Sequence, residues 1–151
     1  MLTVVALHDE AGRLLREDLL AAALPVHRQL RPNLPDEPAA YRAMMARVFA
    51  GGARMFVALD DADQVQGVAL WRVYENTYQG RRLYLDDLVT GEAHRSQGVG
   101  KALLAACEAE AARQGCGYFS LDSGTWRTDA HRFYFREGFT IQSFHFVRPL
   151  G

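Results

Sequence analysis

Two glycines, Gly98 and Gly100, follow an apolar run that ends at Val89 and precede a long alanine-rich run. If these runs are a strand and a helix, the glycines form the turn at the helix N-terminus. There the first backbone N–H groups lack partners and the positive end of the helix dipole is exposed. Glycine lets an anion approach the backbone closely, and Arg95 and Lys101 add positive charge. The pattern predicts an anion-binding site of the kind that accepts a phosphate group.

Two better-known phosphate-binding loops do not fit this turn. A Walker A loop has a glycine at the place of Arg95 and a Ser or Thr at the place of Ala102. A dinucleotide-binding fingerprint needs a third glycine three residues after Gly100, and this chain has Leu103 there. A Gly-x-Gly pair on its own also fits an ordinary turn that caps a structural helix, so the flanking sequence has to decide.

Length, composition and charge restrict the class of protein. The chain has 151 residues, 49% of them hydrophobic, which suits one domain with a substantial core. A formal charge of −1 gives no reason to expect nucleic acid or an anionic membrane as a partner. We expect a cytoplasmic protein, because the first residues do not resemble a leader peptide and no apolar run could span a bilayer. Cys107 and Cys116 lack metal-site spacing and are expected to be structural thiols.

Apolar periodicity and turn residues predict an alternation of strands and helices. Strands are expected at 2–7, 54–59, 65–74, 83–89, 118–121 and, as one strand or a pair, 139–147. Helices are expected at about 14–25, 41–51, 98–113 and 128–137. Pro25 should stop or kink the first helix, and Gly115 should cap the third.

Two signatures in this order resemble those of the GNAT superfamily of acetyl-CoA-dependent N-acetyltransferases. Arg-x-x-Gly-x-Gly at 95–100 resembles the pyrophosphate loop of that family, and 130–139 resembles its Ala-x-x-x-Tyr-x-x-x-Gly-Phe signature. The run at 85–89 resembles the family's strand before the loop. The resemblance covers most of the chain and implies a single domain at 1–151. It also implies the GNAT fold, an α/β (α+β) arrangement with helices on both faces of a mixed, mostly antiparallel, twisted sheet.

The same resemblance implies acetyl-CoA as co-substrate and no metal. The backbone at 88–90 would pair with the pantetheine arm as an added strand would, and the turn at 95–101 would bind the pyrophosphate. The cofactor-binding residues implied are Leu88, Val89, Thr90, Arg95, Ser96, Gln97, Gly98, Val99, Gly100 and Lys101.

Tyr134 is the candidate catalytic side chain. Acyl transfer from a thioester to an amine requires a proton for the departing thiolate, and a phenol close to the sulfur can supply it. Consecutive aromatic residues on a short helix, here Phe133 to Phe135, usually serve packing. It is the family signature that favours a general acid at this position.

No general base is evident. Asp86 and Asp87 are adjacent, so a regular strand would point them to opposite faces. Leu85 and Val89 should share the face of Asp87, which favours Asp87 slightly as a catalytic base, although structural carboxylates are more usual. The other conceivable bases are Glu75, Asp122 and His145.

The acceptor is not specified by the sequence. An aromatic and acidic pocket for a cationic amine could be lined by Trp71, Tyr74, Glu75, Tyr78, Tyr84, Asp86, Asp122 and Trp126. Small-molecule amines, including amino-sugar antibiotics and polyamines, and peptide amines all stay open. Arg127 stands where many family members have Asn, and could bind a phosphate, bind an acceptor carboxylate or simply lie on the surface.

Two other functions also stay open. A non-catalytic acetyl-CoA sensor would bind the cofactor and acetylate no amine. An unrelated nucleotide-binding module would let ATP compete for the site. Pairing of sheet edges could additionally make the protein a homodimer.

Overall fold

The computed structural model describes residues 1–95 and 97–151, so that Ser96 of the expected loop lies outside the described part. The chain forms two compact units, Met1–Ser120 and Leu121–Gly151. The expectation of one domain over the whole chain stays a prediction.

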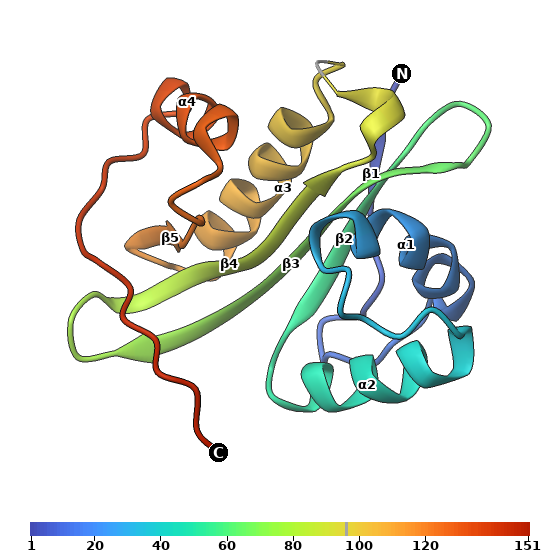
Figure 1. The fold of residues 1–151 in the computed structure, drawn as a ribbon, viewed down its shortest axis with the longest axis horizontal. Helices are drawn as coiled ribbons and strands as arrows, with labels where there is room; N and C mark the ends of the chain where they lie inside the picture. The colour runs from blue at the N-terminus through green and yellow to red at the C-terminus, as the bar shows by residue number, and fades with distance from the viewer. Residues whose placement is uncertain (96) are drawn as a thin grey trace. The chain divides into compact units, whose positions relative to one another are not determined.

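The first unit contains a sheet in the order β1-β2-β3-β4-β5 (Figure 1). Its strands are β1 (Thr3–Ala6), β2 (Arg54–Leu59), β3 (Val65–Asn76), β4 (Gly80–Thr90) and β5 (Tyr118–Leu121), whose last residue belongs to the second unit. Its helices are α1 (Glu17–Leu30), α2 (Pro38–Ala50), the short 3-10 helix η1 (Glu92–His94) and α3 (Val99–Arg113). β1 to β4 pair antiparallel, and α3 connects β4 to β5 in the way that parallel neighbours require. The predicted mixed α/β sheet is confirmed.

Helices cover both faces of this sheet (Figure 1). On one face, α1 and α2 pack side chains such as Leu20 and Tyr41 into a core with Val57 and Val68 of the sheet. On the other face lies α3. A Cβ on Gly67 would come within 2.5 Å of Val99 and 3.0 Å of Leu103, so β3 and α3 approach closely where glycine stands.

The first helix differs from its prediction. α1 continues past Pro25 to Leu30, so the predicted stop near Pro25 was wrong. A proline inside a helix costs about 3 kcal/mol, but Leu24, Val26 and His27 beside it are buried, and burial of this size offsets the cost. The second helix agrees with its prediction, with Glu37 accepting hydrogen bonds from the first turn of α2.

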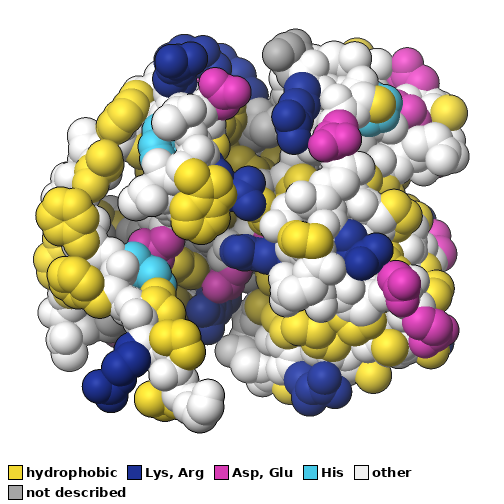
Figure 2. Space-filling model, in the orientation of Figure 1, with side chains coloured by type: hydrophobic (Ala, Val, Ile, Leu, Met, Phe, Trp, Pro, Cys, Tyr) yellow, Lys and Arg dark blue, Asp and Glu magenta, His cyan; other side chains and the backbone are white. Residues whose placement is uncertain are grey.

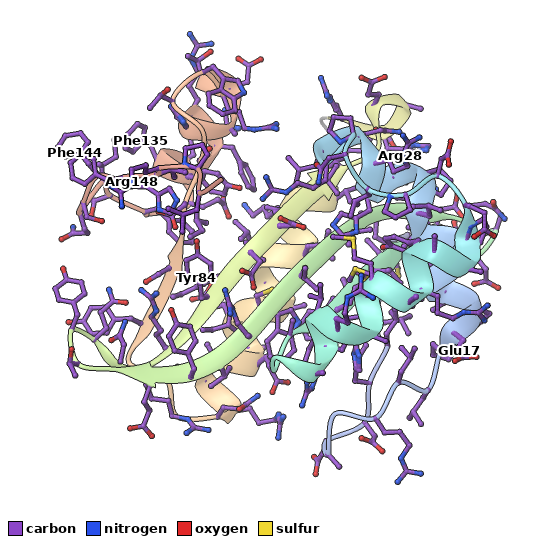
Figure 3. The ribbon with its side chains drawn as sticks, turned by 60° about the horizontal axis from the view of Figure 1, so that its bottom comes forward. Glu17, Arg28, Tyr84, Phe135, Phe144 and Arg148 are labelled. Atoms are coloured by element: carbon purple, nitrogen blue, oxygen red, sulfur yellow. The ribbon has the colours of Figure 1, made fainter. Side chains whose placement is uncertain are left out.

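The second unit contains α4 (Thr128–Arg136), which agrees with the predicted helix. The predicted strand or strand pair at 139–147 was wrong, because none of the described residues from 139 onward is in a strand. An apolar run becomes a strand only where another strand pairs with it. Large apolar side chains of this segment are exposed instead (Figure 2), and Phe144 points outward (Figure 3).

Candidate active site

A β-bulge in β4 decides which way the residues around it face. Leu70 of β3 pairs with Asp87 and the next residue, Trp71, pairs with Leu85, so Asp86 is an extra residue in β4. Leu70 belongs to the core under α1. Leu85 therefore faces the α3 side and Asp87 the α1 side. The expectation that these two share a face was wrong, because the extra residue shifts the alternation by one.

Both carboxylates at the bulge lie on the α1 side of the sheet. Asp87 contacts Arg31 at the end of α1 directly. Asp86 contacts Arg72, which lies two residues after Leu70 in β3 and therefore on the same side of the sheet. The expectation that Asp86 and Asp87 face opposite ways was also wrong. A strand alternates only while its pairing is regular, and a bulge can aim two neighbouring side chains to one side.

Asp87 is held by a buried network. One oxygen lies 2.7 Å from Nε2 of His27, and the other accepts from Nε and Nη2 of Arg31 at 2.9 and 2.6 Å. Nδ1 of His27 lies 2.8 Å from the buried hydroxyl of Tyr41. Burial raises the pKa of Asp87, but the hydrogen bonds from His27 and Arg31 outweigh burial and hold that pKa below its usual value. Both oxygens of this carboxylate are engaged, which makes it a poor acceptor for a substrate proton.

The partners of Asp87 were not predicted from the sequence. His27 and Arg31 stand four residues apart at the end of α1, a spacing that places both on one side of a helix. That signal was lost because the helix was expected to end at Pro25, before either residue.

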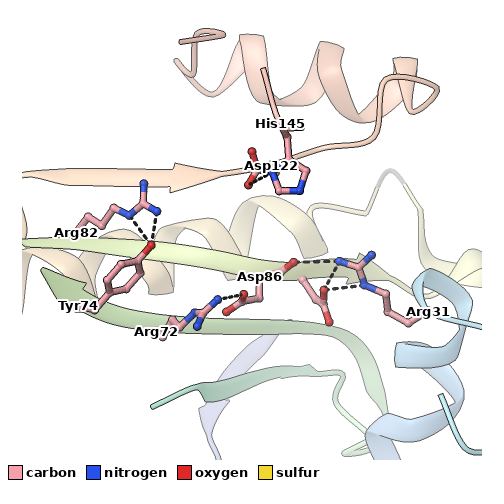
Figure 4. A network of polar contacts seen from close by, with 8 residues as sticks. Arg31, Arg72, Tyr74, Arg82, Asp86, Asp122 and His145 are labelled. Atoms are coloured by element: carbon pink, nitrogen blue, oxygen red, sulfur yellow. Dashed lines mark hydrogen bonds and ion pairs between the residues drawn. The ribbon is translucent and has the colours of Figure 1, made fainter. Parts of the chain in front are cut away.

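Asp86 is less restrained than Asp87. Its Oδ1 accepts one hydrogen bond from Nη2 of Arg72 at 2.9 Å, and its side chain is 24% exposed (Figure 4). Burial raises the pKa of Asp86, and the attraction and hydrogen bond of Arg72 offset that effect only in part, so the pKa lies above its usual value. A reachable carboxylate with a raised pKa is suited to accept a proton from an amine.

Removing the Asp87 carboxylate should weaken the fold. In Asp87→Ala, buried His27 and half-exposed Arg31 lose their acceptor, and we expect the free energy of unfolding to fall by about 3 kcal/mol in urea denaturation. The pKa of Asp87 is lowered in the fold, so its contribution is present above the unfolded pKa of about 3.9 and is lost as pH falls through the folded value. The gap between variant and wild type should therefore narrow in acid.

Asp86→Ala is the matched control for this experiment, because it removes a neighbouring carboxylate that forms one partly exposed ion pair. We expect it to cost no more than about 1 kcal/mol. Equal, small effects of Asp86→Ala and Asp87→Ala would contradict a stabilising network.

The far end of β4 has an edge that β5 does not reach. On one side, 88–90 pairs with β3. On the other side, β5 begins beside Arg81, whose carbonyl accepts a hydrogen bond from the N–H of Gly117 at 2.9 Å, and β5 is four residues long. Four residues extend about 13 Å, whereas residue 88 lies about 23 Å beyond Arg81 along the strand. In the described part of the chain, no strand pairs with this side of 88–90.

α3 begins at the predicted glycine turn. Gly98 has φ of +81°, a left-handed conformation that favours glycine, and the N–H of Ala102 donates the first hydrogen bond of the helix to its carbonyl at 3.0 Å. The N–H groups of 99–101 precede that bond and have no acceptor within the helix. The Arg95 side chain is 70% exposed, and Lys101 is exposed as well. These groups fit a ligand with a diphosphate and an arm that pairs with the open edge of β4.

Tyr134 lies on α4 in the second unit. Its ring packs against Phe133 and Phe139, with centroids 5.5 and 5.7 Å apart. Burial raises the pKa of its hydroxyl, and the positive charge of Arg127 lowers it less. The phenol is therefore protonated at neutral pH, as a proton donor must be. Arg127 itself precedes α4, and its guanidinium lies 6.0 Å from the ring of Trp126.

Only part of the aromatic and acidic set that was expected to line a pocket for a cationic amine shares one face of the first unit. Trp71 is buried on the α3 side, where its ring lies 5.1 Å from that of Phe56. Glu75 alternates with Tyr74, so it faces the other side of β3, and it pairs with Arg81 at 3.6 Å. Trp71 and Glu75 were grouped with the other candidates by residue type alone, and the alternation of side chains along β3 places them on the other face of the sheet.

Arginines and tyrosines instead alternate across β3 and β4 beside the bulge. Arg72 pairs with Tyr84. Tyr74 pairs with Arg82, which donates hydrogen bonds to the Tyr74 hydroxyl (Figure 4). The guanidinium carbon of Arg72 lies 5.7 Å from both ring centres, and that of Arg82 lies 5.0 Å from both. We call these four residues the arginine–tyrosine ladder. Stacking of this kind fixes long arginine side chains in place.

The described residues include both cysteines, which differ in burial, and the side-chain types that ligate metals. No group of three or more His, Cys, Asp or Glu side chains among them could hold a metal ion. Cys107 is buried, and burial, with the charge of Glu110, raises its pKa to about 12. No helix of the described part is long and apolar enough to cross a membrane.

The structure thus combines a mixed sheet that has an open strand edge with a glycine turn that starts a helix. The model of the Acetyltransferase (GNAT) family matches residues 17–139. The chain belongs to this family and is a GNAT N-acetyltransferase.

Two relatives of the chain carry activity names. The uncharacterized N-acetyltransferase YhdJ of Bacillus subtilis is 38% identical over 107 residues, which cover 61% of this chain and 75% of that protein. The aminoalkylphosphonate N-acetyltransferase of Salmonella typhimurium is 39% identical over 66 residues, which cover 44% of this chain and 43% of that protein. The chain matches less than half of the second relative.

Solved structures share the fold. AAC(6')-Iy in complex with the bisubstrate analog CoA-S-monomethyl-acetylneamine has a TM-score of 0.79 at 20% identity, with 100% of this chain and 99% of that chain covered. An acetyltransferase of Trypanosoma brucei has a TM-score of 0.78 at 20% identity, with 99% and 100% covered. At this level of identity the likeness concerns the fold alone.

Proposed function

We propose that the protein transfers the acetyl group of acetyl-CoA to the primary amine of a small molecule by direct attack of the amine on the thioester. The observation that carries this proposal is the open edge of β4 at 88–90 together with the N–H groups of 99–101, which have no acceptor within α3. The edge would pair with the pantetheine arm, and the helix N-terminus with Arg95 and Lys101 would bind the diphosphate. The complex of AAC(6')-Iy with a bisubstrate analog supports the choice of coenzyme A.

Two side chains move protons in the proposed reaction. The amine nitrogen forms a bond to the thioester carbonyl carbon, the carbon–sulfur bond breaks, and Asp86 takes the proton that the amine releases. Tyr134 gives its hydroxyl proton to the departing thiolate. Asp87, which the sequence had favoured as the base, is proposed as a positioning residue, since its contacts with His27 and Arg31 attach the bulge of β4 to α1.

The class of acceptor follows from the relatives only in part. One relative is named for aminoalkylphosphonates and one structural neighbour holds an acetylneamine analog, so a small-molecule amine is the acceptor class that we propose. The experiment is a panel of small amines incubated with acetyl-CoA, in which free thiol reports turnover. We expect at least one amine to accelerate thiol release well above the rate of hydrolysis.

The same panel separates the alternatives. Tight binding of acetyl-CoA without acetylation of any amine would contradict the enzyme and favour a non-catalytic sensor. Displacement of coenzyme A by ATP at similar concentrations would contradict the pantetheine site on β4, because ATP carries no arm to pair with that edge.

A further inference from the structure

We infer that the acceptor is a zwitterionic amine, whose acidic group binds Arg72 while its ammonium group binds Asp86. This inference rests on the proposed function and adds the chemical class of the acceptor. Arg72 and Asp86 form an ion pair at 2.9 Å on the α1 side of the β3–β4 hairpin, with side chains 43% and 24% exposed. A small zwitterion can place its acidic group on the positive charge of Arg72 and its ammonium group on the negative charge of Asp86 at the same time.

The position of this pair suits the transfer. Asp86 lies two residues before Leu88, where the proposed pantetheine edge begins, and two residues of strand extend about 7 Å. An ammonium group that binds Asp86 would thus lie within reach of the thioester for an acceptor the size of a small molecule. Asp86 first takes one proton from the ammonium group and passes it to water. The neutral amine then attacks the thioester carbonyl, and Asp86 takes the second proton, which the nitrogen loses as the amide forms.

Arg72 has donors to spare for an acidic group. A guanidinium carries five N–H donors, and Arg72 gives one of them to Asp86. Its stacking against Tyr74 and Tyr84 holds the planar fork in a fixed orientation. A fixed guanidinium binds a carboxylate or phosphonate through two parallel hydrogen bonds, which a lysine could not reproduce.

The charges of this face disfavour a polycation. Asp86 and Asp87 are already paired with Arg72 and Arg31. Arg82 donates to Tyr74 and Gln79, and it forms no ion pair with any residue in the described part of the chain. Arginine is therefore in excess over carboxylate here. An acceptor with several ammonium groups would be repelled by the excess positive charge, whereas a zwitterion brings an anionic group that the extra arginine can attract.

The test compares primary amines that carry different net charges, with saturating acetyl-CoA at about pH 8.5, where carboxylates are ionised. The probes are 2-aminoethylphosphonate, β-alanine, propylamine and spermidine. We expect kcat/KM for one of the two zwitterions to exceed that for propylamine and spermidine by at least about 10-fold, the value of one charge-assisted contact. In Arg72→Gln, KM for the zwitterion should rise by about 10- to 100-fold, with KM for propylamine and acetyl-CoA nearly unchanged.

Two further variants keep this test specific. Arg81→Gln removes a neighbouring arginine that faces the other side of the hairpin, and it should leave all four acceptors as in the wild type. Arg72→Lys keeps the charge and should restore part of the zwitterion affinity. Faster acetylation of spermidine than of either zwitterion, or an equal loss for all acceptors in Arg72→Gln, would overturn the inference and leave the proposed function standing. Acetyl-CoA binding without acetylation of any probe or any amine in the wider panel would overturn both.

Discussion

We expect the substitution Gly100→Glu to abolish the stabilisation of the protein by coenzyme A. In the wild type, ligand at 100 times its Kd adds about 2.7 kcal/mol to the free energy of unfolding, which raises the melting temperature by several degrees. A glutamate at Gly100 places a side chain and a negative charge among the N–H groups of 99–101, where the diphosphate would bind. Thermal melts with and without coenzyme A measure the loss.

The variant should still fold, because an acidic residue in the first turn of a helix is itself favourable. Ala105→Glu adds the same side chain at an exposed position further along α3, and its melting temperature should rise with coenzyme A as in the wild type. An unchanged rise in Gly100→Glu would remove the pyrophosphate site from this turn.

Tyr134→Phe should lower kcat by about 10²- to 10⁴-fold, the usual contribution of a positioned proton donor. The substitution removes only the hydroxyl, so the ring contacts with Phe133 and Phe139 persist, and KM for acetyl-CoA should change little. Because burial raises the pKa of Tyr134, wild-type kcat should fall only above the ordinary tyrosine value of about 10. That alkaline fall should be absent from the variant. Steady-state rates over a pH series measure both effects.

Tyr118→Phe is the matched control, because Tyr118 carries the same phenol at an exposed position of β5. It should keep the wild-type rate at each pH. Turnover in Tyr134→Phe that equals this control throughout the pH series would eliminate the general-acid role, whatever part the ring plays in packing.

The strands and helices that position the site could be predicted because local patterns specify them. The apolar runs of β2 to β5 stand between turn-forming residues, and Gly98 and Gly115 mark the two ends of α3. The family signatures then located the cofactor turn. These signals are short in range, and each can be recognised without knowledge of the residues that pack against it.

The bulge could not be predicted in this way. Residues 83, 85, 87 and 89 are all buried, which looks like one regular strand with one buried face. In the fold, residues 83 and 85 are buried under α3, whereas 87 and 89 are buried on the opposite face under α1. Every second residue stays buried, although the buried face of the strand changes at the bulge. The partners of Asp87 were missed for another reason: His27 and Arg31 lie about sixty positions away in the chain, beyond the expected end of the first helix at Pro25.

The C-terminal segment shows the opposite failure. Residues 139–147 carry the composition of a strand, and the structure has none there. Composition states what a segment would do beside a partner edge, and it contains no information on whether such an edge is available.

The bulge at Asp86 makes the length of β4 more restrictive than its composition. Many side chains could stand at this position without changing the pairing register, because the inserted residue has no pairing partner in β3. Loss or gain of a single residue would instead turn every side chain on one half of the hairpin over, exposing leucines to water and hiding arginines. Lineages that vary the acceptor chemistry of such a site can therefore exchange the residue at the bulge, but are not free to shorten the strand.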